Sequence, residues 1–162
     1  VGLHRRQPMP EYNFRVATME DLEDVYDMAK EFYEASPYAT THEFSEARVK
    51  EVIRIYLSAP LNEAVVVLML DGELPVGMIA GVNTANLFSE GSQAIEQVWW
   101  VDPPHRKTRA SVTLLMLFEE WAKEIGAKYC VMSSIPELTE LNRLFEGVGF
   151  RLKEQSYLKE VF

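Results

Sequence analysis

The stretch at 94–126 constrains the fold most, because an apolar run, a basic turn and an amphipathic pattern follow one another directly. Residues 94–101 are rich in β-branched and aromatic side chains, which is typical of a mostly buried strand. Asp102, Pro103 and Pro104 interrupt that run. Apolar residues then recur at helical spacing at Leu114, Leu117, Phe118, Trp121 and Ile125. The pattern predicts a strand, a turn and a helix.

The turn places four potential cations in five positions, at His105, Arg106, Lys107 and Arg109. The first turn of a helix has N–H groups without intrahelical partners and carries partial positive charge, so it attracts phosphate. The whole chain has a formal net charge of -9, and a local reversal of sign suits a polyanionic cofactor. The turn therefore predicts an anion site, and the alternative is a solvated loop.

The same residues carry a resemblance. The pattern V-x-P-x-x-R-x-x-x-x-S, from Val101 to Ser111, resembles the coenzyme A site of the GNAT superfamily of N-acetyltransferases, whose usual motif is Q/R-x-x-G-x-G/A. Arg106 fits its first position, whereas Arg109 and Ser111 stand where glycine and glycine or alanine are usual. Glycine lets a backbone approach a pyrophosphate closely, and Arg109 brings a β-carbon into that space. The segments W-V-D-P and E-W-A-K-E-x-G-A resemble uncharacterised acetyltransferases of tailed-phage type.

The order of predicted elements also resembles this fold, beginning with the opening R-V-A-T-M-E-D-L. Thr18 and Asp21 form a capping-box pattern before the first helix, and Ser45 begins the second. Two further helices are expected, one ending at Gly126 and one with apolar residues from Leu138 to Val148. The expected strands are 13–17, 63–70, 75–82, 94–101, 128–133, 150–154 and 157–161.

The predicted class is therefore α+β. The resemblance implies a mixed, mostly antiparallel sheet of about six to seven strands with about four flanking helices. It also implies that the strands at 94–101 and 128–133 splay apart. Residues 1–11, which contain two prolines and show no periodicity, are expected to form a flexible leader, and 12–162 a single acetyltransferase-like domain.

Composition excludes several classes of function. The single cysteine, Cys130, excludes an intramolecular disulfide and a cysteine-based zinc site. It lies in an apolar run, which favours a buried inert thiol over a nucleophile. The negative net charge of the chain argues against nucleic-acid binding. The longest apolar run, 64–70, is far below the roughly 20 residues that span a bilayer, so we expect a soluble cytoplasmic protein without membrane or metal.

The resemblance implies acetyl-CoA as cosubstrate. Its pyrophosphate would lie over residues 105–111, and its pantetheine arm would pair with the strand ending at Val101. The backbone N–H groups near Val98 and Trp99 are candidate donors to the carbonyl oxygen. The expected coenzyme contacts are Val98, Trp99, Trp100, Val101, Arg106, Lys107, Thr108, Arg109, Ala110, Ser111 and Phe145.

A protonated amine must lose a proton before it attacks, and Glu96 is the only acidic side chain on the central strand. It is the candidate general base, and the alternative is a carboxylate that faces a cleft or pairs with a cation.

The leaving thiolate needs a proton, but Phe145 stands where the family often has a tyrosine, and a phenyl ring cannot donate one. Water, Ser133, Ser134 or Tyr157 would substitute, unless the thiolate leaves unassisted.

The predicted activity is acetyl transfer from acetyl-CoA to a primary amine of a small molecule or protein, by direct attack in a ternary complex. Tyr33, Tyr38, Glu96 and Trp99 are the candidate acceptor contacts. The alternatives are a degenerate relative that binds coenzyme A or a protein partner without catalysis, and a structural or interaction protein. The acidity favours a cationic acceptor. A homodimer is compatible with the sequence, which contains no signal for or against it.

Overall fold

The computed structural model describes residues 11–162, and apart from Glu11 the predicted leader lies outside the described residues. The chain divides into two compact units, Val1–Val131 and Met132–Phe162, which are treated separately below.

The first unit is built on a five-stranded sheet with the order β1-β2-β3-β4-β5. The strands are β1 (Tyr12–Val16), β2 (Ala64–Asp71), β3 (Leu74–Ala85), β4 (Ser92–Val101) and β5 (Tyr129–Val131). Every neighbouring pair is antiparallel except β4 and β5, which are parallel. Gly72 makes the hairpin turn between β2 and β3 with a φ of 62°, a conformation that glycine adopts without steric cost.

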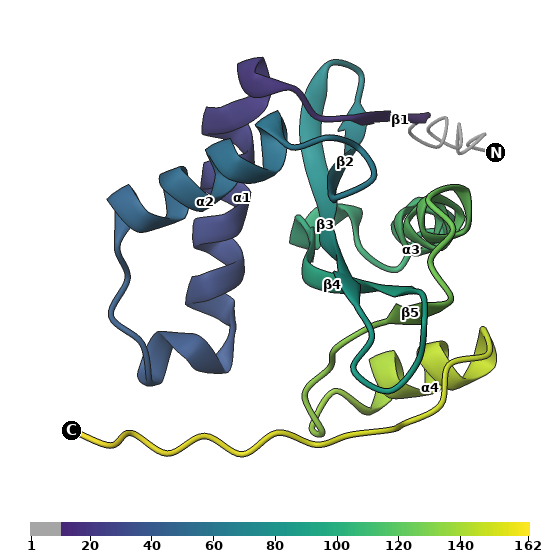
Figure 1. Cartoon of the computed structure of the whole chain (residues 1–162). Helices are drawn as coiled ribbons and strands as arrows, with labels where there is room; N and C mark the ends of the chain where they lie inside the picture. The colour runs from purple at the N-terminus through teal and green to yellow at the C-terminus, as the bar shows by residue number, and fades with distance from the viewer. Residues whose placement is uncertain (1–10) are drawn as a thin grey trace, which may run out of the picture. The chain divides into compact units, whose positions relative to one another are not determined.

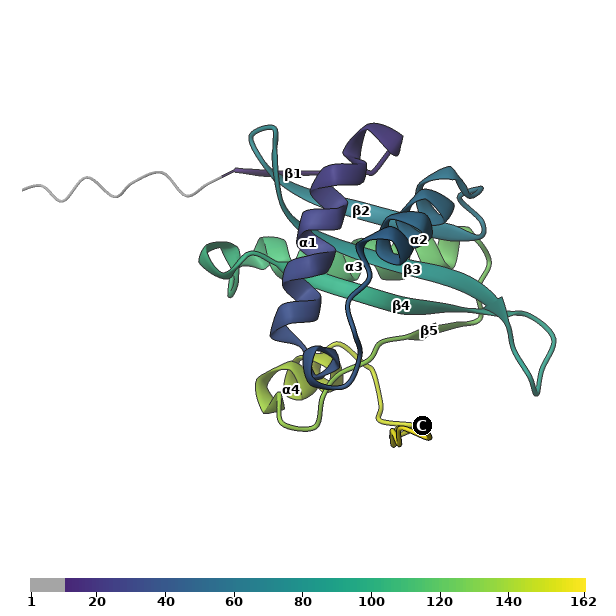
Figure 2. The ribbon, with the colours of Figure 1, turned by 90° about the vertical axis from the view of Figure 1, so that its left-hand side faces the viewer.

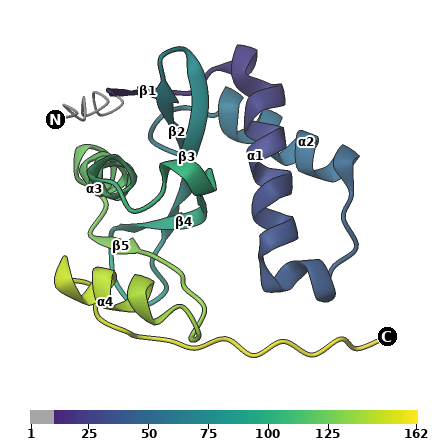
Figure 3. The same ribbon diagram turned by 180° about the vertical axis from the view of Figure 1, so that it is seen from behind.

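Helices cover both faces of this sheet (Figures 1 and 2). α1 (Leu22–Ala35) and α2 (Glu46–Ser58) lie on one face, and α3 (Arg109–Glu124) lies on the other, as the view from behind also shows (Figure 3). The predicted caps are present, because Thr18 and Asp21 form a capping box and the Ser45 side chain accepts a hydrogen bond from Arg48 N. α4 (Thr139–Gly147) belongs to the second unit, so the expected four helices are confirmed.

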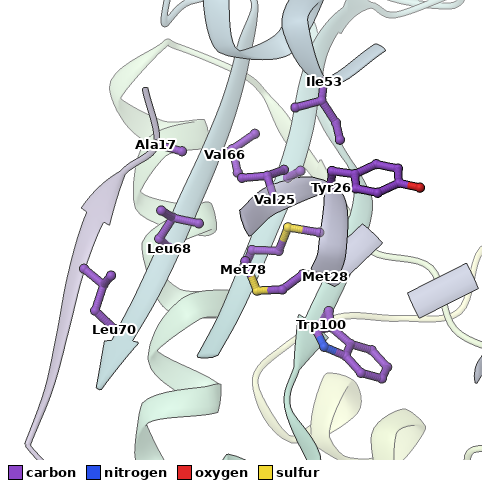
Figure 4. Close-up of a cluster of buried hydrophobic side chains, with 11 residues drawn as sticks. Ala17, Val25, Tyr26, Met28, Ile53, Val66, Leu68, Leu70, Met78 and Trp100 are labelled. Carbon is purple, nitrogen blue, oxygen red and sulfur yellow. The ribbon is translucent and has the colours of Figure 1, made fainter. Parts of the chain in front are cut away.

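The alternation of side chains along β2 divides the core into two layers. Val66, Leu68 and Leu70 point towards α1 and α2, where they pack with side chains such as Met78 and Trp100 (Figure 4). On the other face the ring of Phe118, from α3, approaches β3 so closely that a Cβ at Gly81 would lie 2.3 Å from it. Gly81 is therefore a site of close packing.

The sheet has fewer strands than the six to seven expected. Residues 150–154 and 157–161, predicted as strands from their apolar and aromatic content, carry no strand assignment. The strand expected at 128–133 is shortened to β5, and Tyr129 and Val131 are exposed where a buried strand was predicted. Side-chain composition favours an extended backbone, but a strand also needs a hydrogen-bonding neighbour.

Among the described residues, no helix combines the length and the apolar character that crossing a membrane requires.

Candidate functional site

The central strand β4 is paired on its β5 side over only three residues. Gln93, Ala94 and Ile95 face Tyr129, Cys130 and Val131, and the ladder then ends. From Glu96 to Val101 that edge of β4 has no strand partner among residues 11–162. The backbone groups there can pair with an added extended segment. The expected splay between these strands stays a prediction, because β5 ends at Val131, where its pairing with β4 also ends.

A β-bulge lies where the open edge begins. Val98 pairs with Ala80 and Glu96 pairs with Gly81, so Gln97 is the extra residue on β4. Residues that pair across a sheet share a face. Because the space beside Gly81 is filled by Phe118, Glu96 lies on the α3 face, where it is 7% exposed. The bulge changes the direction of the backbone around Val98. It was not predicted from the sequence, although a glycine within a strand pattern, here Gly81, is a known signal for a bulge.

Cys130 occupies the same region of the sheet, since it pairs with Ala94, two residues before Glu96. Burial, followed by the charges of Glu119 and Glu96, raises the pKa of the Cys130 thiol to about 12. A thiol with this pKa is protonated at neutral pH, which supports the inert role expected from the sequence. No group of three or more metal-ligating side chains occurs within residues 11–162.

Trp99 and Trp100 lie on opposite faces, as expected for a regular strand. Trp100 pairs with Met78 and joins the core beneath α1, whereas Trp99 pairs with Ile79. The Trp100 indole N–H donates to Asp102 Oδ1 at 2.9 Å, which satisfies a largely buried donor. The hydrogen bond and the core packing therefore fix the orientation of the Trp100 ring.

Arg106 folds back towards the strand. Its Nε donates to the Val101 carbonyl at 2.6 Å, and its guanidinium lies over the Trp100 ring at 4.5 Å. Its terminal nitrogens keep their positive charge, so an anion contact remains open to them, but the side chain also fixes the end of β4. The sequence indicated the charge of Arg106 and not this second role.

The turn leads directly into the N-terminus of α3. Thr108 is the N-cap, and its Oγ1 accepts a hydrogen bond from Ser111 N at 3.4 Å. Arg109 and Ala110 form the first helical positions, whose N–H groups have no intrahelical acceptor. The side chains of Lys107 and Arg109 are exposed.

These residues fit a diphosphate group. They offer the amides of a 16-residue helix and three exposed cationic side chains, those of Arg106, Lys107 and Arg109. No side chain within residues 11–162 makes a hydrogen bond to the first two amides of α3. Lys107 has a φ of 59°, a left-handed conformation that favours glycine, although the glycine positions of the motif are 109 and 111.

His105 ties this turn to the far edge of the sheet. Its Nδ1 shares a hydrogen bond with the Tyr12 hydroxyl at 2.8 Å, and the two rings meet edge to face. Tyr12 belongs to β1, so the contact joins residues 93 positions apart. Nothing in the local sequence predicts it, because only the folded sheet brings them together.

An acidic cleft, which sequence reasoning missed, lies beside Trp100 on the α1 side of the first unit. It has a volume of about 550 Å³ and is lined by Glu31, Glu34, Ala35, Trp100, Asp102, Pro103 and Pro104. Burial and the nearby Asp102 carboxylate raise the pKa of Glu31. No lysine or arginine within residues 11–162 forms an ion pair with Glu31, Glu34 or Asp102. The i, i+3 spacing of Glu31 and Glu34 was a signal that could have indicated this acidic face.

Of the predicted acceptor contacts, Tyr33 lies in the last turn of α1 and Tyr38 lies in the α1–α2 connection. The Tyr33 hydroxyl donates to the His42 carbonyl, and its ring packs against Phe44 at 4.9 Å. Tyr38 is exposed and meets the His42 ring edge to face at 5.3 Å. These contacts give the connection a defined shape beside the last turn of α1, which contributes to the cleft.

The remaining candidates belong to the second unit. Ser133 is exposed, and the neighbouring Ser134 hydroxyl hydrogen-bonds to Asn142. Phe145 is buried on α4 and packs near Phe150, with 5.8 Å between ring centroids. Tyr157 is 92% exposed, so no packing against residues 11–162 fixes its hydroxyl.

Comparisons with known proteins agree with this geometry. Residues 22–150 match the family described as the acetyltransferase (GNAT) family. A search of curated proteins returned no match, so the tailed-phage resemblance is not shown. Solved structures with the same fold include the aminoglycoside N-acetyltransferase AAC(6')-Iy bound to the bisubstrate analogue CoA-S-monomethyl-acetylneamine. It has a TM-score of 0.76 and 13% identity, over 94% of this chain and 99% of that one.

Two further structures are similar. AAC(6')-Iy in complex with CoA has a TM-score of 0.75 and 14% identity, over 98% of this chain and 99% of that one. An aminoglycoside 6'-N-acetyltransferase from Acinetobacter haemolyticus has a TM-score of 0.71 and 16% identity, over 93% of this chain and 99% of that one. At these identities the likeness shows the fold.

Proposed function

Because the chain belongs to the GNAT family of acetyltransferases, we propose that it transfers an acetyl group from acetyl-CoA to a primary amine by direct attack in a ternary complex. The open edge of β4, beside the bulge at Gln97, is the observation that carries the proposal. Enzymes of this family use acetyl-CoA, and the basic turn and the first amides of α3 fit its pyrophosphate.

The strand supplies the contacts to the reacting end. When bound, the thioester offers a carbonyl carbon to an amine. The backbone N–H groups of Val98 and Trp99 would donate to the carbonyl oxygen as negative charge develops, an effect commonly worth about 3 kcal/mol. Glu96, the first residue beyond the paired part of β4, would accept the proton of the ammonium group. Ser133 and Tyr157 stay candidates for protonating the thiolate.

The acceptor we propose is a small cationic molecule with more than one amine. An ammonium group gains Coulomb energy beside Glu31, Glu34 and Asp102, whose carboxylates have no cationic side chain paired with them within residues 11–162. The Trp100 ring provides an aromatic surface beside these carboxylates. Aminoglycosides, after which the similar acetyltransferases are named, have this chemistry. The cytoplasmic location expected from the sequence stays a prediction.

Catalysis is tested by measuring free thiol from acetyl-CoA with a panel of mono-, di- and polyamines. The expected result is amine-dependent thiol release that is fastest with polycations. A protein that binds coenzyme A with no release for any amine would instead support the degenerate relative. A protein that binds no coenzyme would contradict both readings.

The coenzyme site is tested with a charge reversal that does not harm the helix. Arg109→Glu places a carboxylate at the N-terminus of α3, where it is favourable for helix stability and repels phosphate. We expect coenzyme affinity to fall about tenfold or more, by calorimetry, as a charge-assisted contact is lost. Lys123→Glu, at the other end of α3, is the matched control, which should retain affinity.

A further inference from the structure

His105 lies in the middle of the turn that joins β4 to α3. Its backbone N–H donates to the Asp102 carbonyl at 2.8 Å, and its own carbonyl accepts a hydrogen bond from Thr108 Oγ1 at 3.2 Å. Asp102 directly follows β4, and Thr108 is the N-cap of α3. The path of the chain between the strand and the helix therefore depends on where His105 lies.

The side chain of His105 gives the turn a support outside itself. The Tyr12 hydroxyl and His105 Nδ1 lie 2.8 Å apart and share a hydrogen bond, and 5.7 Å separates the centroids of the two rings. An unprotonated Nδ1 accepts from the hydroxyl, and a protonated Nδ1 donates to the hydroxyl oxygen, so the bond forms in every state of the ring. Both side chains are half-buried, which limits competition from water.

The support comes from a distant part of the sheet. Tyr12 is the first residue of β1, which β2 and β3 separate from β4. It pairs with Asp71 at the end of β2, a strand that is otherwise buried throughout. Because β1 is paired with a strand of the core, the Tyr12 hydroxyl is held at a fixed position relative to β4.

The turn needs such a support because its backbone contains a strained residue. Lys107 has a φ of 59°, a conformation that a residue other than glycine adopts at a cost in free energy. Strained conformations persist where surrounding contacts determine the backbone. Lys107 lies between His105, which Tyr12 holds, and Thr108, which the helix cap holds. These two contacts therefore hold the left-handed turn from both sides.

A turn that is already ordered in the free protein binds a diphosphate more tightly than a mobile one. Ordering a loop on binding costs free energy that is lost from the affinity. The side chains of Arg106, Lys107 and Arg109 and the first amides of α3 have to converge on one ligand. A small displacement of the turn therefore weakens several contacts at once.

We propose that Tyr12 is a positioning residue for the coenzyme site: its hydroxyl, through His105 Nδ1, holds the turn from Asp102 to Thr108 in the conformation that receives the diphosphate. Tyr12 itself contacts neither the coenzyme nor the reacting atoms. The inference rests on the proposed function, because this turn is the proposed diphosphate site.

The first test removes the hydroxyl and keeps the ring. In Tyr12→Phe, the affinity for coenzyme A, measured by calorimetry, should fall about three- to tenfold, the size of one hydrogen bond. The KM for acetyl-CoA should rise by a similar factor with kcat unchanged, because only binding of the coenzyme is weakened. A fall in kcat with unchanged coenzyme affinity would overturn the positioning role.

The second test needs no ligand. In free Tyr12→Phe, amide hydrogen exchange should become faster at His105 and Arg106, whose N–H groups donate within the turn. Exchange in β2 and α3 should not change, which separates a loosened turn from a destabilised fold. Tyr56→Phe also removes a hydroxyl from a half-buried tyrosine, on α2, and is the matched control that should alter neither exchange nor affinity. Unchanged exchange of the turn in Tyr12→Phe would contradict the proposal.

Two substitutions of His105 separate support of the turn from direct contact with phosphate. An asparagine places its amide where histidine has Nδ1, whereas a glutamine places its amide where histidine has Nε2. His105→Asn should therefore keep coenzyme affinity within about twofold of the wild type, and His105→Gln should lose as much as Tyr12→Phe. Tyr12→Phe combined with His105→Gln should lose no more than either change alone, because both remove the same hydrogen bond. Equal affinities of the Asn and Gln variants would overturn the role of Nδ1.

The outcomes distinguish this inference from the proposed function. A wild-type chain that binds no coenzyme A contradicts both. A wild-type chain that binds coenzyme A with the same affinity as Tyr12→Phe leaves the proposed function in place and overturns only the role of Tyr12.

Discussion

The two faces of the sheet in the first unit differ in whether their carboxylates are buried or line an open cleft. On the α3 face, Glu96 is buried beside a strand that Phe118 approaches at van der Waals contact. On the α1 face, Glu31 and Asp102 line an open cleft next to Trp100. Burying one carboxylate costs free energy, whereas an open cleft can hold several charges that a ligand neutralises. We propose proton transfer on the first face and acceptor binding on the second, so the proton would pass from the amine to Glu96 by way of water, around the open edge of β4.

The largest effect should come from Glu96 on the closed face. Glu96→Gln should lower kcat about 100- to 10,000-fold, the usual contribution of a general base, with unchanged coenzyme affinity. Steady-state kinetics across pH is the measurement. A variant that keeps the wild-type pH profile would show that Glu96 is not the base.

Glu119→Gln is the matched control, since Glu119 is the other carboxylate whose charge raises the pKa of Cys130. It should leave kcat nearly unchanged. Each substitution removes a negative charge that raises the pKa of the Cys130 thiol. Both variants should therefore alkylate faster at Cys130 at alkaline pH. This measurement checks that the two carboxylates lie near Cys130, and it does not depend on enzyme activity.

Packing on the closed face is tested at Gly81. A Cβ there would lie 2.3 Å from the Phe118 ring and 2.7 Å from the Ile95 carbonyl, so Gly81→Ala should lower the free energy of unfolding by about 1 to 3 kcal/mol. Urea unfolding measures it. Gly147→Ala meets nothing within 4 Å and should be neutral or slightly stabilising. Equal effects at both glycines would contradict the tight contact between β3 and α3.

The open face is tested at Glu31. Glu31→Gln should raise the acceptor KM about fivefold, in the range expected for one partly screened charge. Burial and the Asp102 carboxylate raise the pKa of Glu31, so in the wild type this glutamate gains a proton at a higher pH than usual. The acceptor KM should therefore rise as pH falls. The variant should lose that part of the pH dependence.

The control for this test is Glu120→Gln, an exposed change on α3 that should not alter KM. The melting temperature of Glu31→Gln should not fall, because removing one of two neighbouring carboxylates relieves repulsion. An unchanged KM at all pH values would place the acceptor elsewhere.

The smallest effect concerns the turn that joins β4 to α3. Lys107 has a φ of 59°, so Lys107→Gly should stabilise the protein by about 0.5 to 1 kcal/mol, after the extra entropy of unfolded glycine is counted. Lys123→Gly within α3 should instead destabilise it by about 1 kcal/mol. Chemical unfolding of the two variants compares them, and destabilisation by Lys107→Gly would contradict the left-handed turn.

Much of the site could be predicted because it is local. The run from Val98 to Arg109 encodes a strand, a turn and a helix N-terminus in consecutive residues, and the structure has all three. The expectation that β4 and β5 splay apart came from the family resemblance. The acidic cleft could not be predicted in the same way, because Glu31 and Asp102 are 71 positions apart and only the packing of α1 against β4 brings them together.

The sequence by itself determined the basic turn before α3 and the helical faces, since hydrophobic period, capping residues and local charge act over a few positions. Tertiary structure alone decided that a bulge at Gln97 sets the face of Glu96, that Tyr12 anchors His105, and that the last thirteen residues form no strand. The physical reason is that each of these depends on a hydrogen-bonding or packing partner supplied from elsewhere.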